Sequence, residues 1–417
     1  MSTLQLVAIP IVAAVLACAA ARTAPAQDAP RPGKPEKVDP FADPFTKNDA
    51  EKLAKLGYVA IGRFLWLGDV TTDQVQQVLG DDFAIFLETE HFRIASTLRS
   101  LAWPRDKEHR DSLADELDRL AEVCPELKTR PRTITPWLRA HLYAQRLERL
   151  YADFVARLGI ETDRFPKGRG GGARTPDYMG EGPYLGQPDK FLVVLTQKAT
   201  SAGTYTRAFH GKAAADTVRH NHVDAGSLEV VTSAEFAEKA LMDDRKLHCH
   251  VTFQVVHNLI DGYKFFWQPQ PAWLTEGLPL WFSRRVDEEF LNFSGRDHAG
   301  SGVLRAHEWA RRVRMRVEND AWPKAAELCT IADATKLDYA GHMMAWSRVD
   351  FLFAARPAEF GRFVAHMKAP MTTEARLPTT EEMLGRQVEA LRGAFQWDYD
   401  AFDAEWVEYV RTRYPKK

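Results

Sequence analysis

The chain has 417 residues, of which 45% are hydrophobic and 27% are charged, and its formal net charge is −2 at pH 7. This length is enough for one large domain or for two smaller ones. A nucleic-acid binder normally carries a basic excess, which this chain lacks, so we expect no nucleic-acid partner.

The first 26 residues are predicted to be a signal peptide. An apolar, alanine-rich run is followed by small residues, with A-P-A at 24–26 typical of a cleavage site. The sequence V-L-A-C at 15–18 also resembles a lipoprotein box, so a lipid anchor on Cys18 is the alternative. No other run is long and apolar enough to span a bilayer. We therefore expect a secreted or periplasmic protein that has no membrane span.

Residues 27–47 are rich in Pro, Ala and charge, which predicts a disordered linker. Residues 48–165 are predicted to form an N-terminal helical region with one strand at 84–94. Its clearest helix is expected at 137–158, where apolar residues recur every three to four positions. A glycine-rich loop at 166–187 neither follows a strand nor leads into a helix, so it is read as a surface insertion rather than a phosphate-binding loop.

Residues 188–415 are predicted to form a second region that begins with strands and continues as helices. The runs KFLVVLT at 190–196 and SLEVVT at 227–232 have the β-branched composition of buried strands. From residue 234 onward the pattern is mainly helical. The fold class expected for the whole chain is α+β, mainly helical, with a small mixed sheet.

One predicted helix carries a set of residues that share a face. These residues are His250, Phe253, Gln254 and His257. At about 100° per residue they fall within an arc of about 100°. Glu276 follows on the next predicted helix, in W-L-T-E-G at 273–277. The imidazole of His257 and the carboxylate of Glu276 are chemical groups that can bind zinc.

This arrangement resembles the gluzincin-type zinc peptidases, which carry H-E-x-x-H on one helix and a glutamate ligand on the next. The likeness covers roughly residues 83–415. It implies a sheet packed on the site helix and a cleft in which an extended substrate pairs with an edge strand, here 227–232. By this resemblance His257 matches the second zinc-binding histidine and Glu276 matches the distal glutamate.

The chain departs from that pattern at two positions. Phe253 and Gln254 stand where the first histidine and the catalytic glutamate would be. A phenyl ring cannot bind zinc, and a neutral amide cannot accept a proton from a zinc-bound water. Two ligands without a third rarely hold zinc, so we expect no cofactor, with zinc as the metal to test. A hydrogen bond between His257 and Glu276 would preserve the packing in its absence.

Three functional classes remain open. The favoured one is a pseudopeptidase that binds a polypeptide, a glycan or an envelope protein without cutting it. Its expected cleft residues are Phe253, Gln254, His257, Trp273 and Glu276. The second class is an active zinc-dependent peptidase whose missing ligand comes from elsewhere. The third is a purely structural scaffold in an envelope assembly.

The active-enzyme alternative needs a third ligand. His250 shares the helix face but lies about 10.5 Å along the helix from His257. His220 and His222, with His210 nearby, are read as loop histidines that could approach the site. Tyr339 and His342 stand where related enzymes place groups that stabilise an oxyanion, with aromatic packing as the other explanation.

Besides Cys18, the chain contains three cysteines, Cys124, Cys249 and Cys329. Because three is an odd number, at least one must stay free or pair between chains. A Cys124–Cys329 bridge is one option in an oxidising compartment.

Overall fold

The computed structural model describes residues 41–170, 174–175, 177–293, 308–371 and 376–416. The predicted signal peptide with Cys18, and residues 27–40 of the predicted linker, lie outside these residues.

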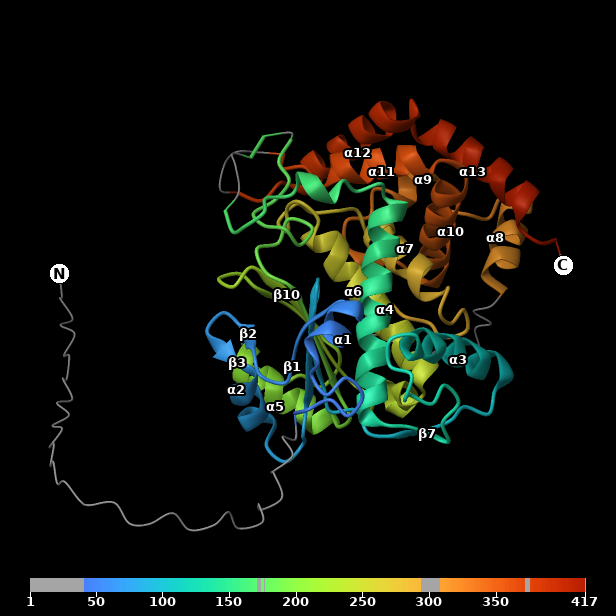
Figure 1. The fold of residues 1–417 in the computed structure, drawn as a ribbon. Coiled ribbons are helices and arrows are strands. Elements are labelled where there is room, and N and C mark those ends of the chain that lie inside the picture. Colours follow the sequence, from blue (N-terminus) through green and yellow to red (C-terminus); the bar gives the residue numbers. More distant parts are fainter. Residues whose placement is uncertain (1–40, 171–173, 176, 294–307, 372–375, 417) are drawn as a thin grey trace, which may run out of the picture. The chain divides into compact units, whose positions relative to one another are not determined.

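A mixed sheet of six strands, in the order β1-β4-β5-β8-β10-β9, is the centre of the fold (Figure 1). Strands β5, β8 and β10 run parallel, and the other neighbours pair antiparallel. The strands are β1 Tyr58–Ile61, β4 Ile85–Thr89, β5 Phe92–Ser96, β8 Phe191–Thr196, β9 Val218–His222 and β10 Ser227–Ser233. Two small ribbons pair β2 Leu65–Leu67 with β3 Val70–Thr71, and β6 Leu101–Ala102 with β7 Thr133–Ile134.

Helices make up most of the remaining described chain, which confirms the predicted α+β, mainly helical class. They are α1 Ala50–Lys55, α2 Thr72–Leu79, α3 Lys107–Ala121, α4 Pro136–Arg157, α5 Ala199–His210, α6 Asp244–Gly262, α7 Ala272–Ser283, α8 Trp309–Glu318, α9 Ala325–Leu328, α10 Tyr339–Ala355, α11 Pro357–Met367, α12 Thr380–Phe395 and α13 Tyr399–Arg413. None of the described helices combines the length and the apolar character needed to cross a membrane.

The predicted strands at 190–196 and 227–232 and the predicted helix at 137–158 correspond to β8, β10 and α4. The run at 84–94, expected as one strand, forms two. Strands β4 and β5 are joined by a turn at Glu90 and His91, where Glu148 of α4 accepts a hydrogen bond from the His91 backbone N–H. The turn contains neither glycine nor proline, so the sequence did not predict it. The hydrogen bond to Glu148 of α4 stabilises it.

The structure differs from three further expectations about organisation. The run 227–232, expected at the sheet edge, is an inner strand, because β9 pairs on its outer side. The end of the predicted linker, 41–47, forms turns that pack on the body of the protein. There Asp43 is buried and its Oδ2 lies 3.2 Å from His141 Nε2 of α4. The sheet itself takes strands from both 48–165 and 188–415, so it crosses the boundary expected between those regions.

Helices cover both faces of the sheet. Helix α4 packs on β4 and β5, α6 packs on β10, and α5 packs on β8 and β10. Because side chains alternate along a strand, neighbouring residues of β10 show which helix lies on which face. The side chain of Leu228 reaches Gly262 of α6, whereas Glu229 binds Tyr205 of α5. Helices α5 and α6 therefore lie on opposite faces of β10.

A buried ion network joins α6 to the helices beside it. Asp244, the first residue of α6, lies 2.8 Å from Arg146 of α4, and Arg146 lies 2.8 Å from Glu116 of α3. Arg139 Nη2 lies 3.6 Å from Asp244. All of these side chains are buried, so each charge depends on its partner rather than on water.

We expect Arg146→Met to lower the free energy of unfolding by about 3 kcal/mol or more, because the change leaves buried carboxylates without their main counter-charge. Denaturation in urea measures this loss. Arg149→Met, at an exposed position of the same helix, should change the free energy by less than about 0.5 kcal/mol. If both variants lost the same free energy of unfolding, the buried ion network would not contribute to stability as we expect.

The same network predicts a pH dependence. Burial alone would raise the pKa of Asp244, but the charges of Arg146 and Arg139 outweigh it and hold that pKa well below its usual 3.8. A carboxyl group whose pKa is lowered by folding stabilises the fold above its unfolded pKa, and this stabilisation is lost as the pH falls. The free energy of unfolding should therefore fall between about pH 5 and about pH 2, and it should fall less steeply in Arg146→Met. Identical slopes would show that Arg146 does not set the pKa of Asp244.

Candidate functional site

The two retained candidate ligands lie next to each other. Helix α6 carries His257, helix α7 carries Glu276, and the two helices pack together. His257 Nε2 lies 3.7 Å from Glu276 Oε1, and the side chains are 4% and 0% exposed. This distance is longer than a hydrogen bond. The structure thus brings the pair together at ion-pair distance, without the hydrogen bond that we expected between them.

Phe253 packs directly against His257. The two ring centroids lie 4.7 Å apart in an edge-to-face arrangement, and Phe253 is buried. Gln254, the next residue, is half-buried. The position that the resemblance assigns to a first zinc-binding histidine therefore holds an aromatic ring in contact with His257.

Trp273, expected in the wall of a cleft, is instead a core residue. It is 1% exposed, and its Nε1 donates a hydrogen bond to Gln387 Oε1 at 2.6 Å. Its ring packs against Phe363 and Phe402. Together with the burial of Phe253, His257 and Glu276, this shows that four of the five expected cleft residues lie inside the protein.

A further histidine, His342 of α10, also reaches Glu276. Its Nδ1 lies 3.4 Å from Glu276 Oε2. Glycine at 277 makes this approach possible, because a Cβ there would lie 2.6 Å from the Ala345 carbonyl oxygen of α10. Tyr339, the other residue of this motif, accepts a hydrogen bond from Trp309 Nε1 at 2.6 Å. Of the two candidates at 339–342, His342 is the one that the structure brings to Glu276.

Burial determines the charge state of His257. It lowers the pKa of His257 well below its usual value, and the positive charges of Arg219 and His342 act in the same direction. The imidazole is therefore neutral at neutral pH. In the described part of the chain its buried Nε2 has no hydrogen-bond partner.

We tested whether these residues fit the zinc that the resemblance implies. His257 and His342 approach different oxygens of Glu276, at 3.7 and 3.4 Å. Those separations are close to the roughly 3.3 Å between neighbouring ligands of a tetrahedral zinc ion, but the two imidazoles do not converge on one point with the carboxylate. Among the described residues, one group of three side chains has all its ligand atoms within 4.8 Å of one another, and this group does not include His257, Glu276 or His342. This geometry does not fit a three-ligand zinc centre.

His250, considered as a third ligand, is held in other contacts. Its Nε2 lies 2.8 Å from Thr217 Oγ1, and its Nδ1 lies 2.8 Å from Asn292 Oδ1. With both ring nitrogens engaged in this way, His250 does not complete a metal site with His257.

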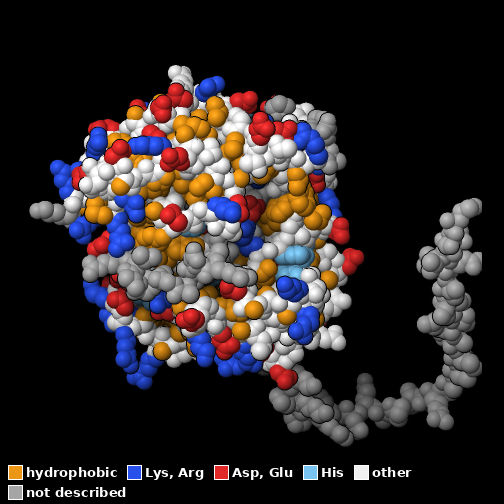
Figure 2. All heavy atoms as spheres, turned by 180° about the vertical axis from the view of Figure 1, so that it is seen from behind, with side chains coloured by type: hydrophobic (Ala, Val, Ile, Leu, Met, Phe, Trp, Pro, Cys, Tyr) orange, Lys and Arg blue, Asp and Glu red, His pale blue; other side chains and the backbone are white. Residues whose placement is uncertain are grey.

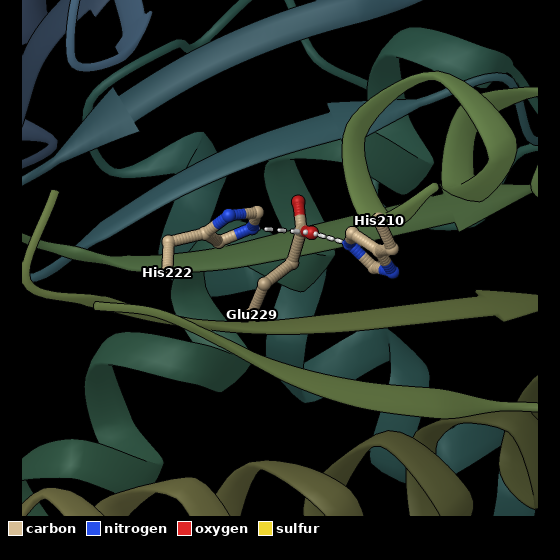
Figure 3. A group of neighbouring side chains, drawn as sticks. All are labelled: His210, His222 and Glu229. Carbon is tan, nitrogen blue, oxygen red and sulfur yellow. Dashed lines mark hydrogen bonds and ion pairs between the residues drawn. The ribbon is translucent and has the colours of Figure 1, made fainter. Parts of the chain in front are cut away.

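The group whose ligand atoms do converge consists of His210, His222 and Glu229 (Figure 3). His210 Nε2 lies 2.5 Å and His222 Nε2 lies 3.0 Å from the same oxygen, Glu229 Oε2. Figure 3 shows the two imidazoles on either side of the carboxylate, both pointing to it. Glu229 is fully buried in β10, His222 belongs to β9, and His210 is the last residue of α5.

One aromatic side chain contacts this carboxylate directly, and a second packs on His210. Tyr205 donates a hydrogen bond to Glu229 Oε1 at 2.5 Å, and the His220 ring stacks on His210 at 4.1 Å. Burial alone would raise the pKa of Glu229, but the hydrogen bonds with His210 and His222 lower it to about 2. Glu229 is therefore a buried anion at neutral pH.

The sheet separates this group from His257. Glu229 points toward α5, whereas His257 belongs to α6, on the other face of β10. His220 and His222 lie on strand β9 rather than on a loop, and they cannot supply a third ligand to His257. We did not identify Glu229 from the sequence. One feature of the sequence could have indicated it: Glu229 lies in SLEVVT, a run otherwise typical of a buried strand. A charged side chain in a buried strand needs a partner.

A groove lies near the end of β9. One cavity of about 310 Å³ is lined by Arg174, Phe265, Trp267, Arg376 and Leu377. A smaller one, of about 100 Å³, shares the first three of these and extends to Asn221 and Val223. We call the two together the aromatic groove. The back face of the molecule shows apolar side chains at the surface beside basic and histidine side chains (Figure 2).

No protein-family model and no curated protein sequence matches the chain. The three described cysteines, Cys124, Cys249 and Cys329, are buried free thiols, so the Cys124–Cys329 bridge is not formed.

The contact between Phe253 and His257 predicts a gain of function. In Phe253→His with Gln254→Glu, an imidazole would face His257 beside Glu276 and complete the usual ligand set. The purified double variant should retain one equivalent of zinc more than the unchanged chain, as measured by plasma mass spectrometry. Adding Glu276→Gln should abolish the extra equivalent. A folded double variant without extra zinc would mean that the helix is wrongly aligned with the peptidase motif.

Proposed function

We propose that this chain is a pseudopeptidase, a non-hydrolytic protein with the architecture of a gluzincin-type peptidase domain. The observation that carries the proposal is the contact of Phe253 with His257 beside Glu276 on two packed helices. The two retained residues are adjacent, as in the peptidase motif, while the position of the first ligand holds a phenyl ring. In this proposal the chain has the fold of the peptidase domain but lacks the residues that bind the catalytic zinc and activate water.

The chemical groups around His257 support a non-hydrolytic role. Hydrolysis by this class of site needs a metal-bound water and a base that accepts its proton. Gln254 stands at the position of the base and carries a neutral amide. His257 and Glu276 are closed off from solvent, so a substrate would not reach them without a rearrangement of α6 and α7.

The ligand that we propose is an extended polypeptide bound along β9. This strand is the outermost of the sheet on its side, and an exposed strand edge pairs readily with another chain through backbone hydrogen bonds. The aromatic groove continues from the end of β9, where Val223 is 60% and Trp267 is 43% exposed. Apolar side chains of the bound segment would enter this groove. A polypeptide explains the strand edge and the groove together, which a glycan does not.

The N-terminal segment supports the placement of this function outside the cytoplasm. Its apolar run and small residues are those of a secretory signal, with Cys18 as the candidate lipid anchor. The polypeptide ligand would then be an extracellular or envelope protein.

We expect Trp267→Ala to weaken the binding of peptides selected from a random library by about tenfold or more, because a large aromatic side chain in a groove is a typical binding hot spot. Fluorescence anisotropy measures the change. Met315→Ala, at a comparably exposed residue of α8, is the matched control and should have no effect.

Two further measurements separate the possible outcomes. Methylation of backbone nitrogens in the peptide should weaken binding to the unchanged protein, because strand addition uses main-chain N–H groups. Mass spectrometry of the incubated library should find no cleaved peptide. Cleavage that depends on His257 would contradict the proposal, and binding of glycans but not of peptides would overturn the ligand class.

A further inference from the structure

We propose that His210, His222 and Glu229 form a binding site for a divalent transition metal, with zinc as the preferred ion. Two imidazole nitrogens and one carboxylate oxygen are a ligand set that suits zinc. The site lies on the face of β10 that α5 covers, away from His257. The argument for it does not use the His257–Glu276 pair, although His222 lies on β9, the strand along which we propose that the polypeptide binds.

The ligand atoms already converge on one point. Both Nε2 atoms approach Glu229 Oε2, at 2.5 and 3.0 Å, and the three ligand atoms lie within 4.8 Å of one another. Zinc bonds of about 2.0 Å place tetrahedral ligands about 3.3 Å apart. The two Nε2 atoms would therefore have to move away from Oε2 by less than about 1 Å to admit the ion, which small rotations of the side chains can provide without a change in the backbone.

Regular secondary structure holds each ligand in place. His222 and Glu229 lie on the paired strands β9 and β10, where Glu229 is directly opposite His220. His210 ends α5, which is closed by Gly211 in the left-handed conformation at φ 76°. A site on strands and a helix end is more precisely positioned than one on loops.

The second oxygen of the carboxylate is held by a chain of hydrogen bonds. Tyr205 donates to Glu229 Oε1 at 2.5 Å, and Trp66 Nε1 donates to the Tyr205 hydroxyl at 2.8 Å. All three side chains are buried. Such outer contacts orient a ligating carboxylate, here with Oε2 left toward the histidines.

The charge of the site also favours a cation. Glu229 is 0% exposed, and within the described residues its ion-pair partners are two histidines rather than a lysine or arginine. A divalent ion would balance this buried charge while both imidazoles remain neutral. The side chains of His210 and His222 are 6% and 9% exposed, so the histidine side of the site lies nearer to solvent than Glu229 does.

His220 is a wall of the site rather than a ligand. Its ring stacks on His210 at 4.1 Å and lies 4.6 Å from the His222 ring, but its nitrogens do not belong to the converging group. The protein therefore supplies three ligands and leaves the fourth position to water or another small ligand. Three protein ligands with an open position are typical of reactive rather than structural zinc sites.

The test is metal binding to the full chain after removal of bound metal. We expect the apo-protein to bind one equivalent of Zn²⁺, and Co²⁺ to give the visible absorption of a four-coordinate ion. Glu229→Gln and His222→Ala should each weaken Zn²⁺ binding by more than about 100-fold, because even outer contacts contribute up to that factor. Tyr205→Phe should weaken it by about tenfold.

His366→Ala is the matched control, since it removes an exposed imidazole of α11 that lies outside the site and should leave Zn²⁺ binding unchanged. Circular dichroism verifies that each variant is folded. If Glu229→Gln does not fold, His222→Ala on the edge strand and Tyr205→Phe decide the question. A folded apo-protein that binds neither Zn²⁺ nor Co²⁺, or binding that His222→Ala and Tyr205→Phe leave unchanged, would overturn the proposal.

Discussion

The alternation of side chains along β10 is the constraint on which the rest of this structure depends. Leu228 packs toward Gly262 of α6, and its neighbour Glu229 points to α5. One strand thus supports the helix of the peptidase-like motif on one face and holds a buried carboxylate on the other. A shift of register by one residue would exchange these faces, so the pairing of β10 with β8 and β9 fixes both sites at once.

The two polar sites differ in how their charges are compensated. At Glu276, the packing of α7 on α6 brings His257 to one carboxylate oxygen, and its packing on α10 around Gly277 brings His342 to the other. Phe253 packs against His257. At Glu229, two imidazoles converge on a single oxygen while Tyr205 holds the other. The first arrangement favours a packed interior, whereas the second favours an ion. The proposed metal site thus lies on the face of β10 opposite the His257–Glu276 pair, whose geometry does not fit a three-ligand zinc centre.

Much of the fold could be predicted, because β8 and β10 have β-branched runs and α4 has a clear helical repeat of apolar residues. Strand β9 could not, since V-R-H-N-H has little apolar character and becomes a strand by pairing with β10. Trp273 was misplaced in a cleft because a large aromatic residue suits a groove and a core equally well in sequence. The juxtaposition of His257 and Glu276 followed from the motif, but Glu229 needed the tertiary structure, as its partners come from α5 and β9.

Anomalous X-ray diffraction at the zinc absorption edge, on crystals of the full chain grown with Zn²⁺, tests the central claim most directly. It locates an ion without any mutation and distinguishes the two faces of β10. We predict an anomalous peak bounded by His210, His222 and Glu229, and none between His257 and Glu276. A peak between His257 and Glu276 would contradict the account, because it would restore the metal centre that Phe253 is proposed to have replaced.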